Sequence, residues 1–200
     1  MKLFMSATSP FVRKVRVMIR EANLTDAVQE IEVATTVIAP DPTVVAANPT
    51  GKIPTLLRGD GPAIYDSRVI TRFLDDRADA GFYPQARLWD VLTLEATADG
   101  IMEAAVLITY EARLRPVEKQ FADWTEGQWI KVSDAVRAIN DRWISQLSGP
   151  LDMGQISVGC ALAYLDFRHD ARGWRDGNVA LANWYAQFST RDSMTGTTPQ

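Results

Sequence analysis

The residues with the clearest chemical potential lie in the stretch Asn48–Leu57, which reads NPTGKIPTLL. Its Pro-Thr-Gly turn leads into a short apolar strand that opens with Ile53-Pro54. Proline cannot donate a backbone hydrogen bond to a sheet, and the peptide bond before it is the kind that adopts the cis form. A cis bond here would leave the N–H and C=O of Ile53 free to pair with an extended, peptide-like ligand. We therefore predict a docking edge at Ile53 and a cis Pro54; a trans proline that opens an ordinary edge strand is the alternative.

A second group of chemically capable residues surrounds the expected start of a helix at Ser9-Pro10. Serine is a good N-cap, and proline is favoured at the first helical position. Arg13, Lys14 and Arg16 then put positive charge into the first turns, where the helix dipole disfavours cations. A bound anion at this helix end would resolve the conflict. A solvated basic face explains the same residues equally well.

The elements that must position these residues follow from the apolar periodicity of the first part of the chain. The turn Gly59-Asp60-Gly61 predicts that the strands on either side of it are antiparallel neighbours. Asp66 is a natural N-cap for the helix that begins at Asp66-Ser67. The expected order is β-α-β-α-β-β-α: a strand at 2–6, a helix after Ser9, a strand within 28–37, a short irregular or helical crossover at 40–47, strands near 56–57 and 63–65, and the helix from Asp66. Residues 77–81 are polar, small and aperiodic, which is typical of a linker.

Beyond the linker the sequence has no convincing strand pattern and predicts an all-helical region, with segments at 85–113, 125–147, 153–170 and 179–188. Asp152-Met153-Gly154-Gln155 indicates a capping box, in which Asp152 accepts from a first-turn N–H and Gln155 reaches back to the cap. The helix that follows is apolar enough to be central to its domain, so Cys160 should be inert core. We expect domains at 1–76 and 86–200, joined by a linker at 77–85.

Composition excludes several classes of function. The 200 residues carry a net charge of −4 and a pI near 5.1, so no overall field attracts nucleic acid or an acidic membrane surface. The apolar start is too brief for a signal peptide, and no run approaches the roughly 20 apolar residues of a membrane span. We expect a cytoplasmic protein without nucleic-acid or membrane partners. One cysteine and one histidine exclude an internal disulfide and leave no Cys/His cluster for zinc, so no metal is expected.

Four strings, taken together and in this order, carry a resemblance to a known family. They are TSPFVRKVR at Thr8–Arg16, NPTGKIPTL at Asn48–Leu56, YDSRVITRFL at Tyr65–Leu74 and ALAYLDFR at Ala161–Arg168. The chain resembles the cytosolic glutathione transferases, and bacterial members in particular, over essentially its whole length. The resemblance implies a thioredoxin-like N-terminal domain followed by an all-α domain. Asp66 stands where many members have Gln or Glu, and Ser9 stands where many bacterial members have cysteine.

The resemblance also implies a glutathione site. Ile53, before the cis proline, would pair its backbone with the cysteinyl part of glutathione, and Lys52 would meet the glycyl carboxylate or the peptide backbone. Asp66 can accept from the α-ammonium of the γ-glutamyl end, while Ser67 and helix N–H groups donate to its α-carboxylate. A plain helix cap is the alternative for this pair. The implied glutathione-binding set is Ser9, Phe11, Lys52, Ile53, Pro54, Asp66 and Ser67.

Ser9 is the implied catalytic residue, because it would face the glutathione sulfur. A serine hydroxyl is not acidic enough to act as the base, and no histidine or cysteine lies nearby in sequence to activate it. It should act as a donor, since a hydroxyl hydrogen bond and a helix N-terminus both favour thiolate over thiol. Arg13 could add to this effect if its side chain points toward the sulfur. If Ser9 only caps the helix, it does not act on the sulfur.

A second substrate would sit between the domains, against Phe11 and the first long helix of the second domain. The implied lining residues recur at helical spacing: Met102, Val106, Tyr110 and Arg113. Core or dimer packing is the alternative use of such a stripe. The resemblance further implies a homodimer, in which Asp99 reaches the glutathione of the partner subunit.

Two functions from different classes fit the sequence. The first is an enzyme that activates glutathione thiolate for attack on a small, largely apolar electrophile. The second is a non-catalytic module that keeps the fold for binding or protein interaction. A disulfide exchange of the glutaredoxin kind would need a nucleophilic cysteine at position 9, where the chain has serine. No motif identifies the electrophile.

Overall fold

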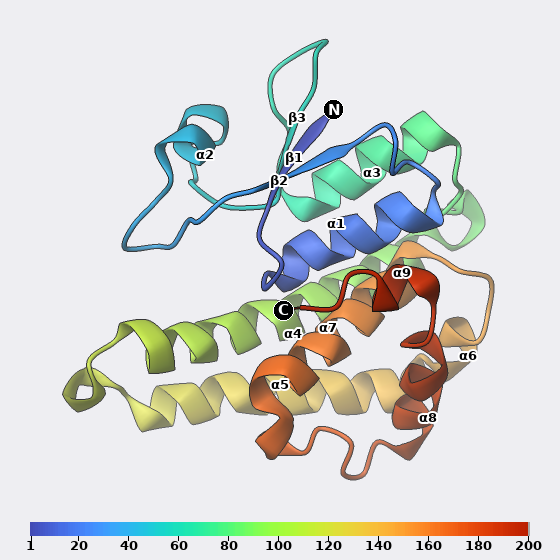
Figure 1. Ribbon diagram of the computed structural model, residues 1–200. Helices are drawn as coiled ribbons and strands as arrows, with labels where there is room; N and C mark the ends of the chain where they lie inside the picture. Colours follow the sequence, from blue (N-terminus) through green and yellow to red (C-terminus); the bar gives the residue numbers. More distant parts are fainter. Residues whose placement is uncertain (200) are drawn as a thin grey trace. The chain divides into compact units, whose positions relative to one another are not determined.

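The computed structural model describes residues 1–199, which form two compact units (Figure 1). The first unit contains residues 1–83 together with the chain end from Asp192 on, and the second contains Pro84–Arg191. The first combines a small sheet with helices, and the second is helical. The predicted fold class, an α/β unit followed by an all-α unit, is confirmed.

The sheet of the first unit is built from β1 (Lys2–Met5), β2 (Gln29–Glu32) and β3 (Thr55–Leu57). The strand order is β2-β1-β3, with β1 parallel to β2 and antiparallel to β3. The strand expected at 63–65 is reduced to one antiparallel bridge between Leu56 and Ile64. That bridge still makes the two segments neighbours across the Gly59-Asp60-Gly61 turn, as predicted.

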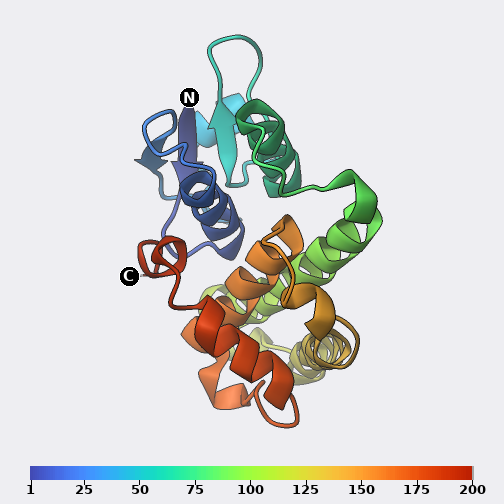
Figure 2. The same cartoon turned by 90° about the vertical axis from the view of Figure 1, so that its right-hand side faces the viewer.

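Three helices follow the expected order: α1 (Pro10–Glu21), α2 (Pro42–Ala47) and α3 (Ser67–Ala78). Each begins after an N-cap whose side chain accepts a backbone N–H: Ser9, Asp41 and Asp66. α1 and α3 lie side by side (Figures 1 and 2). Their apolar faces are fully buried and form much of this unit's core with Leu3 and Leu56.

The segment expected to be a linker at 77–85 belongs largely to the first unit. α3 continues through Ala78, and Asp79 ends it in the left-handed conformation with φ 48°. The backbone N–H of Phe82 donates to Asp75 at 2.8 Å, and the Tyr83 hydroxyl lies 2.8 Å from that of Thr71. Because two buried aromatic residues anchor the chain here, the unit extends beyond the polar string that suggested its end.

The second unit contains η1 (Gln85–Arg87), α4 (Leu88–Leu114), η2 (Val117–Lys119), α5 (Ala122–Arg142), α6 (Ile144–Leu147), α7 (Met153–His169), η3 (Asp170–Arg172) and α8 (Val179–Phe188). α7 is buried along most of its length and packs against α4, which also packs against α5. Cys160 is fully buried in α7, as predicted. Among the helices of residues 1–199, none has the length and apolar character needed to cross a bilayer.

The start of α7 confirms one half of the predicted capping box and corrects the other. Asp152 accepts from the Gln155 backbone N–H at 3.1 Å. The Gln155 side chain does not return to the cap. It donates instead to the carbonyls of Gln146, Gly149 and Pro150, the shortest of these bonds being 2.8 Å to Pro150. The buried amide therefore serves the preceding turn, where it gives the Gly149 and Pro150 carbonyl groups a donor.

The chain end also departs from the expected domain at 86–200. A short helix, α9 (Asp192–Thr195), packs against α1 and belongs to the first unit (Figure 2). Residues 192–199 lack an apolar period long enough to predict a helix. Contacts with a distant segment fix their position, and such contacts leave no periodic signal in sequence.

Candidate functional site

The register of the sheet brings three separate segments to one end of the first unit. β1 and β3 run antiparallel with Phe4 opposite Thr55, so the chain that leaves β1 and the chain that enters β3 lie at the same end. The bridge between Leu56 and Ile64 directs the chain that enters α3 toward that end as well. The three segments carry Ser9, Ile53-Pro54 and Asp66-Ser67.

The predicted docking edge has the expected backbone form. The Ile53-Pro54 bond is cis, which confirms that prediction. Within residues 1–199, no other backbone group pairs with the N–H or the C=O of Ile53. Pro54 itself is buried, while Ile53 is half-buried. A peptide-like ligand can therefore pair with Ile53 as an added strand does.

Asn48 organises the turn that presents this edge, a role that sequence reasoning missed. It is 1% exposed, and its amide nitrogen donates to the Lys52 carbonyl at 3.0 Å and to the Thr55 hydroxyl at 3.1 Å. Its amide oxygen accepts from the N–H and the hydroxyl of Thr50. One side chain thus joins both ends of the turn. An asparagine directly before a Pro-Thr-Gly turn is the available sequence signal, since asparagine commonly bonds to backbone groups of its own turn.

Ser9 caps α1, and its capping bond leaves the hydroxyl proton free. The Val12 N–H donates to Ser9 Oγ at 3.3 Å, so the oxygen acts as the acceptor. In the described part of the chain, Ser9 Oγ donates to no group. A hydroxyl can accept and donate at the same time. Capping and donation to a ligand sulfur are therefore compatible at this residue.

Asp66 is already engaged by the protein at the start of α3. Its Oδ1 accepts from the Arg68 backbone N–H at 3.0 Å, and its Oδ2 pairs with the Arg68 guanidinium at 2.9 Å. Partial burial acts to raise the pKa of Asp66, but the hydrogen bonds and charge of Arg68 outweigh it and hold this pKa below its ordinary value, with help from the charge of Lys14. The carboxylate is thus kept ionised. Arg68 was not singled out in the sequence, although its spacing from Asp66 is typical of a contact across a helix start.

Ser67 differs from Asp66 because its side chain makes no contact of this kind. The residue is 3% exposed and opens α3, and within residues 1–199 its hydroxyl has no hydrogen-bond partner. The first N–H groups of a helix also lack partners inside the helix. Hydroxyl and helix N-terminus together form an arrangement suited to a carboxylate.

Two further predicted residues flank these groups. Lys52 is exposed in the turn before Ile53, and in the described chain its ammonium has no partner. Phe11 is half-buried in the first turn of α1, next to the buried Pro10. Both therefore belong to the segments that meet at this end of the sheet.

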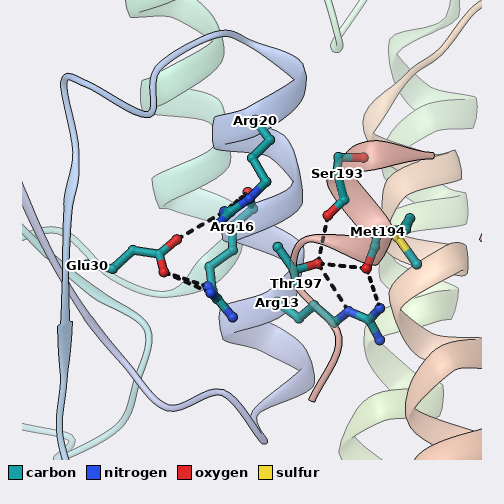
Figure 3. Close-up of polar contacts among 7 residues, drawn as sticks. All are labelled: Arg13, Arg16, Arg20, Glu30, Ser193, Met194 and Thr197. Carbon is teal, nitrogen blue, oxygen red and sulfur yellow. Dashed lines mark hydrogen bonds and ion pairs between the residues drawn. The ribbon is translucent and has the colours of Figure 1, made fainter. Parts of the chain in front are cut away.

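Of the three basic residues for which the sequence left two alternatives, Arg13 and Arg16 follow neither, and Lys14 is fully buried. Arg16 and Arg20 pair with Glu30 of β2 at 2.8 Å and 3.0 Å, which ties α1 to the sheet (Figure 3). Arg13 is 6% exposed and donates to the chain end, at 2.9 Å to the Met194 carbonyl. Protein groups hold the charges of Arg13, Arg16 and Arg20, so neither a basic surface nor a bound anion is needed to explain these three residues.

Apart from Phe11 of α1, the residues predicted for a second substrate lie in α4 of the second unit. Met102 is fully buried, Val106 is half-buried, and Tyr110 and Arg113 are exposed. Asp99 is 3% exposed on the same helix. A role of this set toward an electrophile, or of Asp99 toward a partner subunit, stays a prediction. Within residues 1–199, no group of acidic, histidine or cysteine side chains is arranged to hold a metal ion.

Comparison with known proteins gives consistent matches. Residues 8–77 match the glutathione S-transferase N-terminal domain, and residues 122–187 match the glutathione S-transferase C-terminal domain. The GST-like protein YibF of Escherichia coli K12, itself uncharacterized, is 29% identical over all of this chain and 98% of its own length.

Two crystal structures of a glutathione transferase family member from Pseudomonas fluorescens Pf-5 are similar throughout. One, with bound glutathione, is 40% identical with a TM-score of 0.97, covering 100% of this chain and 98% of that one. The other, with bound S-(propanoic acid)-glutathione, is 39% identical with a TM-score of 0.92, covering both chains completely at 100%.

Proposed function

Because this chain belongs to the glutathione S-transferase family, we propose that it is an enzyme that activates the thiol of glutathione for attack on a small electrophile. Glutathione binds at the end of the sheet where the segments of Ser9, Ile53-Pro54 and Asp66-Ser67 meet. The bound glutathione in a relative that is 40% identical supports this ligand. The glutathione thioether bound in the second structure supports a reaction at sulfur.

One observation carries the proposal: at this end of the sheet, each segment offers a group with unused hydrogen-bonding capacity. The Ile53 backbone suits the peptide part of the ligand, and the Ser67 hydroxyl suits its α-carboxylate. Asp66 keeps lone pairs for the α-ammonium beyond those that Arg68 occupies, since a carboxylate accepts about four hydrogen bonds. The Ser9 hydroxyl, with its free proton, then has the sulfur as its partner.

The chemistry required of Ser9 is stabilisation of an anion. Surroundings that combine donors with a helix N-terminus bring thiol pKa values from about 8.5 to roughly 3.5–7.5. The thiol proton leaves to solvent, and the sulfur lone pair forms a carbon–sulfur bond with the electrophile. In a substitution the leaving group departs with the electron pair of its bond to that carbon; in an addition the π pair moves to the adjacent atom, which then takes a proton from solvent. Because Ser9 gives only a hydrogen bond, no covalent enzyme intermediate is formed. We further propose that the exposed residues Tyr110 and Arg113 of α4 contact the electrophile, whereas the fully buried Met102 serves the core.

The test is the ionisation of bound glutathione. Ser9→Ala should raise the pKa of the bound thiol by about one unit, the scale of one hydrogen bond to an anion, while glutathione affinity stays within about tenfold. Turnover of a model electrophile should fall more than binding does. The measurement is ultraviolet difference absorbance of the thiolate against pH, with turnover assayed alongside.

Two further variants separate donation from capping. Ser9→Gly removes the hydroxyl but costs a helix start only a few tenths of a kcal/mol, whereas alanine costs about 1 kcal/mol. Ser9→Thr keeps both functions. We expect Gly to raise the thiol pKa as Ala does, and Thr to leave it close to the wild-type value. Identical titrations in wild type, Ala and Gly would reject the donor role and favour a non-catalytic binding module.

A further inference from the structure

Residues 192–199 form a segment that lies along α1 in the first unit (Figure 3). We call residues 192–199 the C-terminal strap; it comprises α9 and the coil after it. Ser193 bonds to Glu21 in the last turn of α1, and Thr197 accepts from Arg13 near the first turn. The strap therefore runs antiparallel to α1 and reaches from its end to its beginning.

Arg13 is the anchor at the beginning of α1. Its Nη2 donates to the Met194 carbonyl at 2.9 Å, and its Nε donates to the Thr197 hydroxyl at 3.3 Å. Both acceptors are neutral, and among the described residues no carboxylate contacts this guanidinium. Met194 lies in the single turn of α9, and arginine side chains commonly bond to the last carbonyl groups of a helix. The planar fork of arginine suits two fixed acceptors in a way that lysine does not.

The Thr197 hydroxyl completes this contact. It donates to the Ser193 carbonyl at 2.8 Å while it accepts from Arg13. Thr197 is 1% exposed, so the network is shielded from water. A buried network of this kind fixes geometry, because each member that loses its partner is left unpaired in a place that water does not reach.

The same arginine is bonded to the turn that carries Ser9. The Arg13 backbone N–H donates to the Ser9 carbonyl at 3.0 Å. The Arg13 side chain therefore bonds to the strap, and its backbone bonds to the N-cap residue of α1. Arg13 joins the two segments in this way. At α1 alone its charge is misplaced, since a cation near a helix N-terminus is unfavourable. The two hydrogen bonds to the strap stabilise the Arg13 charge at this position.

We propose that Arg13 is a positioning residue, through which the C-terminal strap fixes the first turn of α1 and with it the Ser9 hydroxyl. This rests on the proposed function in so far as Ser9 meets the glutathione sulfur. A donor must lie within about 0.5 Å of its productive place to act fully on a ligand. Loosening this turn weakens the bond to sulfur, while the Ile53 edge and the Asp66-Ser67 pair still bind the rest of glutathione.

The first experiment uses the free protein and does not depend on glutathione. Amide hydrogen exchange is followed at positions 13 and 14 in wild type, Arg13→Gln and Thr197→Val. We expect exchange at these amides to be about tenfold faster in both variants, the factor that corresponds to 1.4 kcal/mol of lost local stability. Thr197→Val keeps Arg13 and nearly the same side-chain volume, and it removes only the hydroxyl that accepts from Arg13. It therefore tests the role of the strap even if Arg13→Gln fails to fold. Unchanged exchange in Thr197→Val would overturn the proposal.

The second experiment measures the bound thiol in the same proteins. Arg13→Gln and Thr197→Val should raise the thiol pKa by about half a unit to one unit and lower kcat, with KM for glutathione within about threefold. Arg13→Lys keeps the positive charge but cannot donate to both acceptors as the planar guanidinium does. If the two hydrogen bonds to the strap are what matters, the thiol in Arg13→Lys should still have a raised pKa. Restoration by lysine would show that charge alone acts on the sulfur, and would overturn the positioning role.

Arg16→Gln is the matched control, because it removes the same charge from the same helix where the partner is Glu30. It should leave the thiolate titration and the exchange at position 13 unchanged. An equal effect in Arg16→Gln would mean that any loss of charge on α1 suffices, which contradicts the proposal. If the wild-type protein does not bind glutathione, the proposed function fails, and the exchange experiment still decides whether the strap orders this turn.

Discussion

Asp66 and Ser67 are adjacent, yet the structure gives them different tasks at the start of α3. Asp66 is the cap and the partner of Arg68, so its substitution disturbs both the helix and the charge balance. Ser67 opens the helix with a hydroxyl that has no hydrogen-bond partner among the described residues. A test of the γ-glutamyl subsite is therefore cleaner at Ser67.

Ser67→Ala should weaken glutathione binding by about 1.5–3 kcal/mol, the usual worth of a hydrogen bond to a charged group. That corresponds to roughly 10- to 150-fold in the dissociation constant. Stability should change little, because no protein hydrogen bond is lost. Calorimetric titration with glutathione measures the first effect, and urea unfolding measures the second.

The companion variant is Asp66→Asn, which keeps a good N-cap but removes the charge. It should also weaken binding, and the thiol pKa should stay as in wild type because the change lies at the far end of the tripeptide. A Ser67→Ala protein with wild-type affinity would show that this pair is only a helix start, and the γ-glutamyl end would need another site.

At the scale of elements, α4 and α7 are joined by a buried polar cluster around His169. His169 Nε2 lies 2.9 Å from the Ala105 carbonyl and 3.2 Å from the Thr109 hydroxyl, which also accepts from Tyr164. The carbonyl can only accept, so this nitrogen carries the proton. Burial lowers the pKa of His169, the bond to Ala105 opposes this, and the charges of Arg172 and Arg168 lower it further, so that the pKa lies below its ordinary value.

This shift predicts a loss of stability on acidification. With its pKa lowered in the folded state, His169 takes up a proton first in the unfolded chain, which then binds more protons than the native state. Stability is full above the ordinary histidine value of about 6.5 and falls as the pH drops below it toward the folded pKa. Urea unfolding at pH 7.5 and pH 5.5 should show this loss in wild type.

His169→Gln provides the comparison, since glutamine retains a donor of similar reach and does not titrate. Carboxylates contribute equally to both proteins, so the difference between their pH dependences isolates His169. A wild-type protein that loses no more stability than the variant between these two pH values would contradict the assigned state of His169.

Local signals in the sequence predicted the elements well where a residue acts on its own neighbourhood. The caps at Ser9, Asp66 and Asp152 follow from side chains that bond a few residues ahead. The predictions failed where a side chain serves a distant or preceding segment. Gln155 bonds to the turn before its helix, and Arg13 bonds to α9, which is distant in sequence. No periodicity reports such pairings, because they depend on how the chain returns on itself.

At the scale of the whole molecule, the candidate site also combines features that the sequence reveals with contacts between distant segments that it does not. The residue types and order of Ser9, Ile53-Pro54 and Asp66-Ser67 are visible in sequence, and the register of the sheet brings their segments to one end. What sequence could not supply is the support around them. Asn48 holds the turn from within, Arg68 fixes the Asp66 carboxylate, and the chain end braces α1.

Glutathione should stabilise the whole folded protein, because a ligand that binds only the native state shifts unfolding by mass action. At 100 times its dissociation constant, the gain is about 2.7 kcal/mol. For a chain of this size each kcal/mol raises Tm by roughly 2–4 °C, so the expected rise is on the order of 5–10 °C. Thermal unfolding over a glutathione titration measures it.

The controls for this titration follow from the chain itself. Cys160 is the single cysteine and is fully buried, so no disulfide exists for a thiol to reduce, and dithiothreitol at the same concentration should leave Tm unchanged. Cysteinylglycine lacks the γ-glutamyl end that Asp66-Ser67 binds, so it should give a much smaller rise than glutathione. Equal rises with all three thiols would mean that the effect is not recognition of the tripeptide, and no rise at millimolar glutathione would remove the ligand on which the proposed function depends.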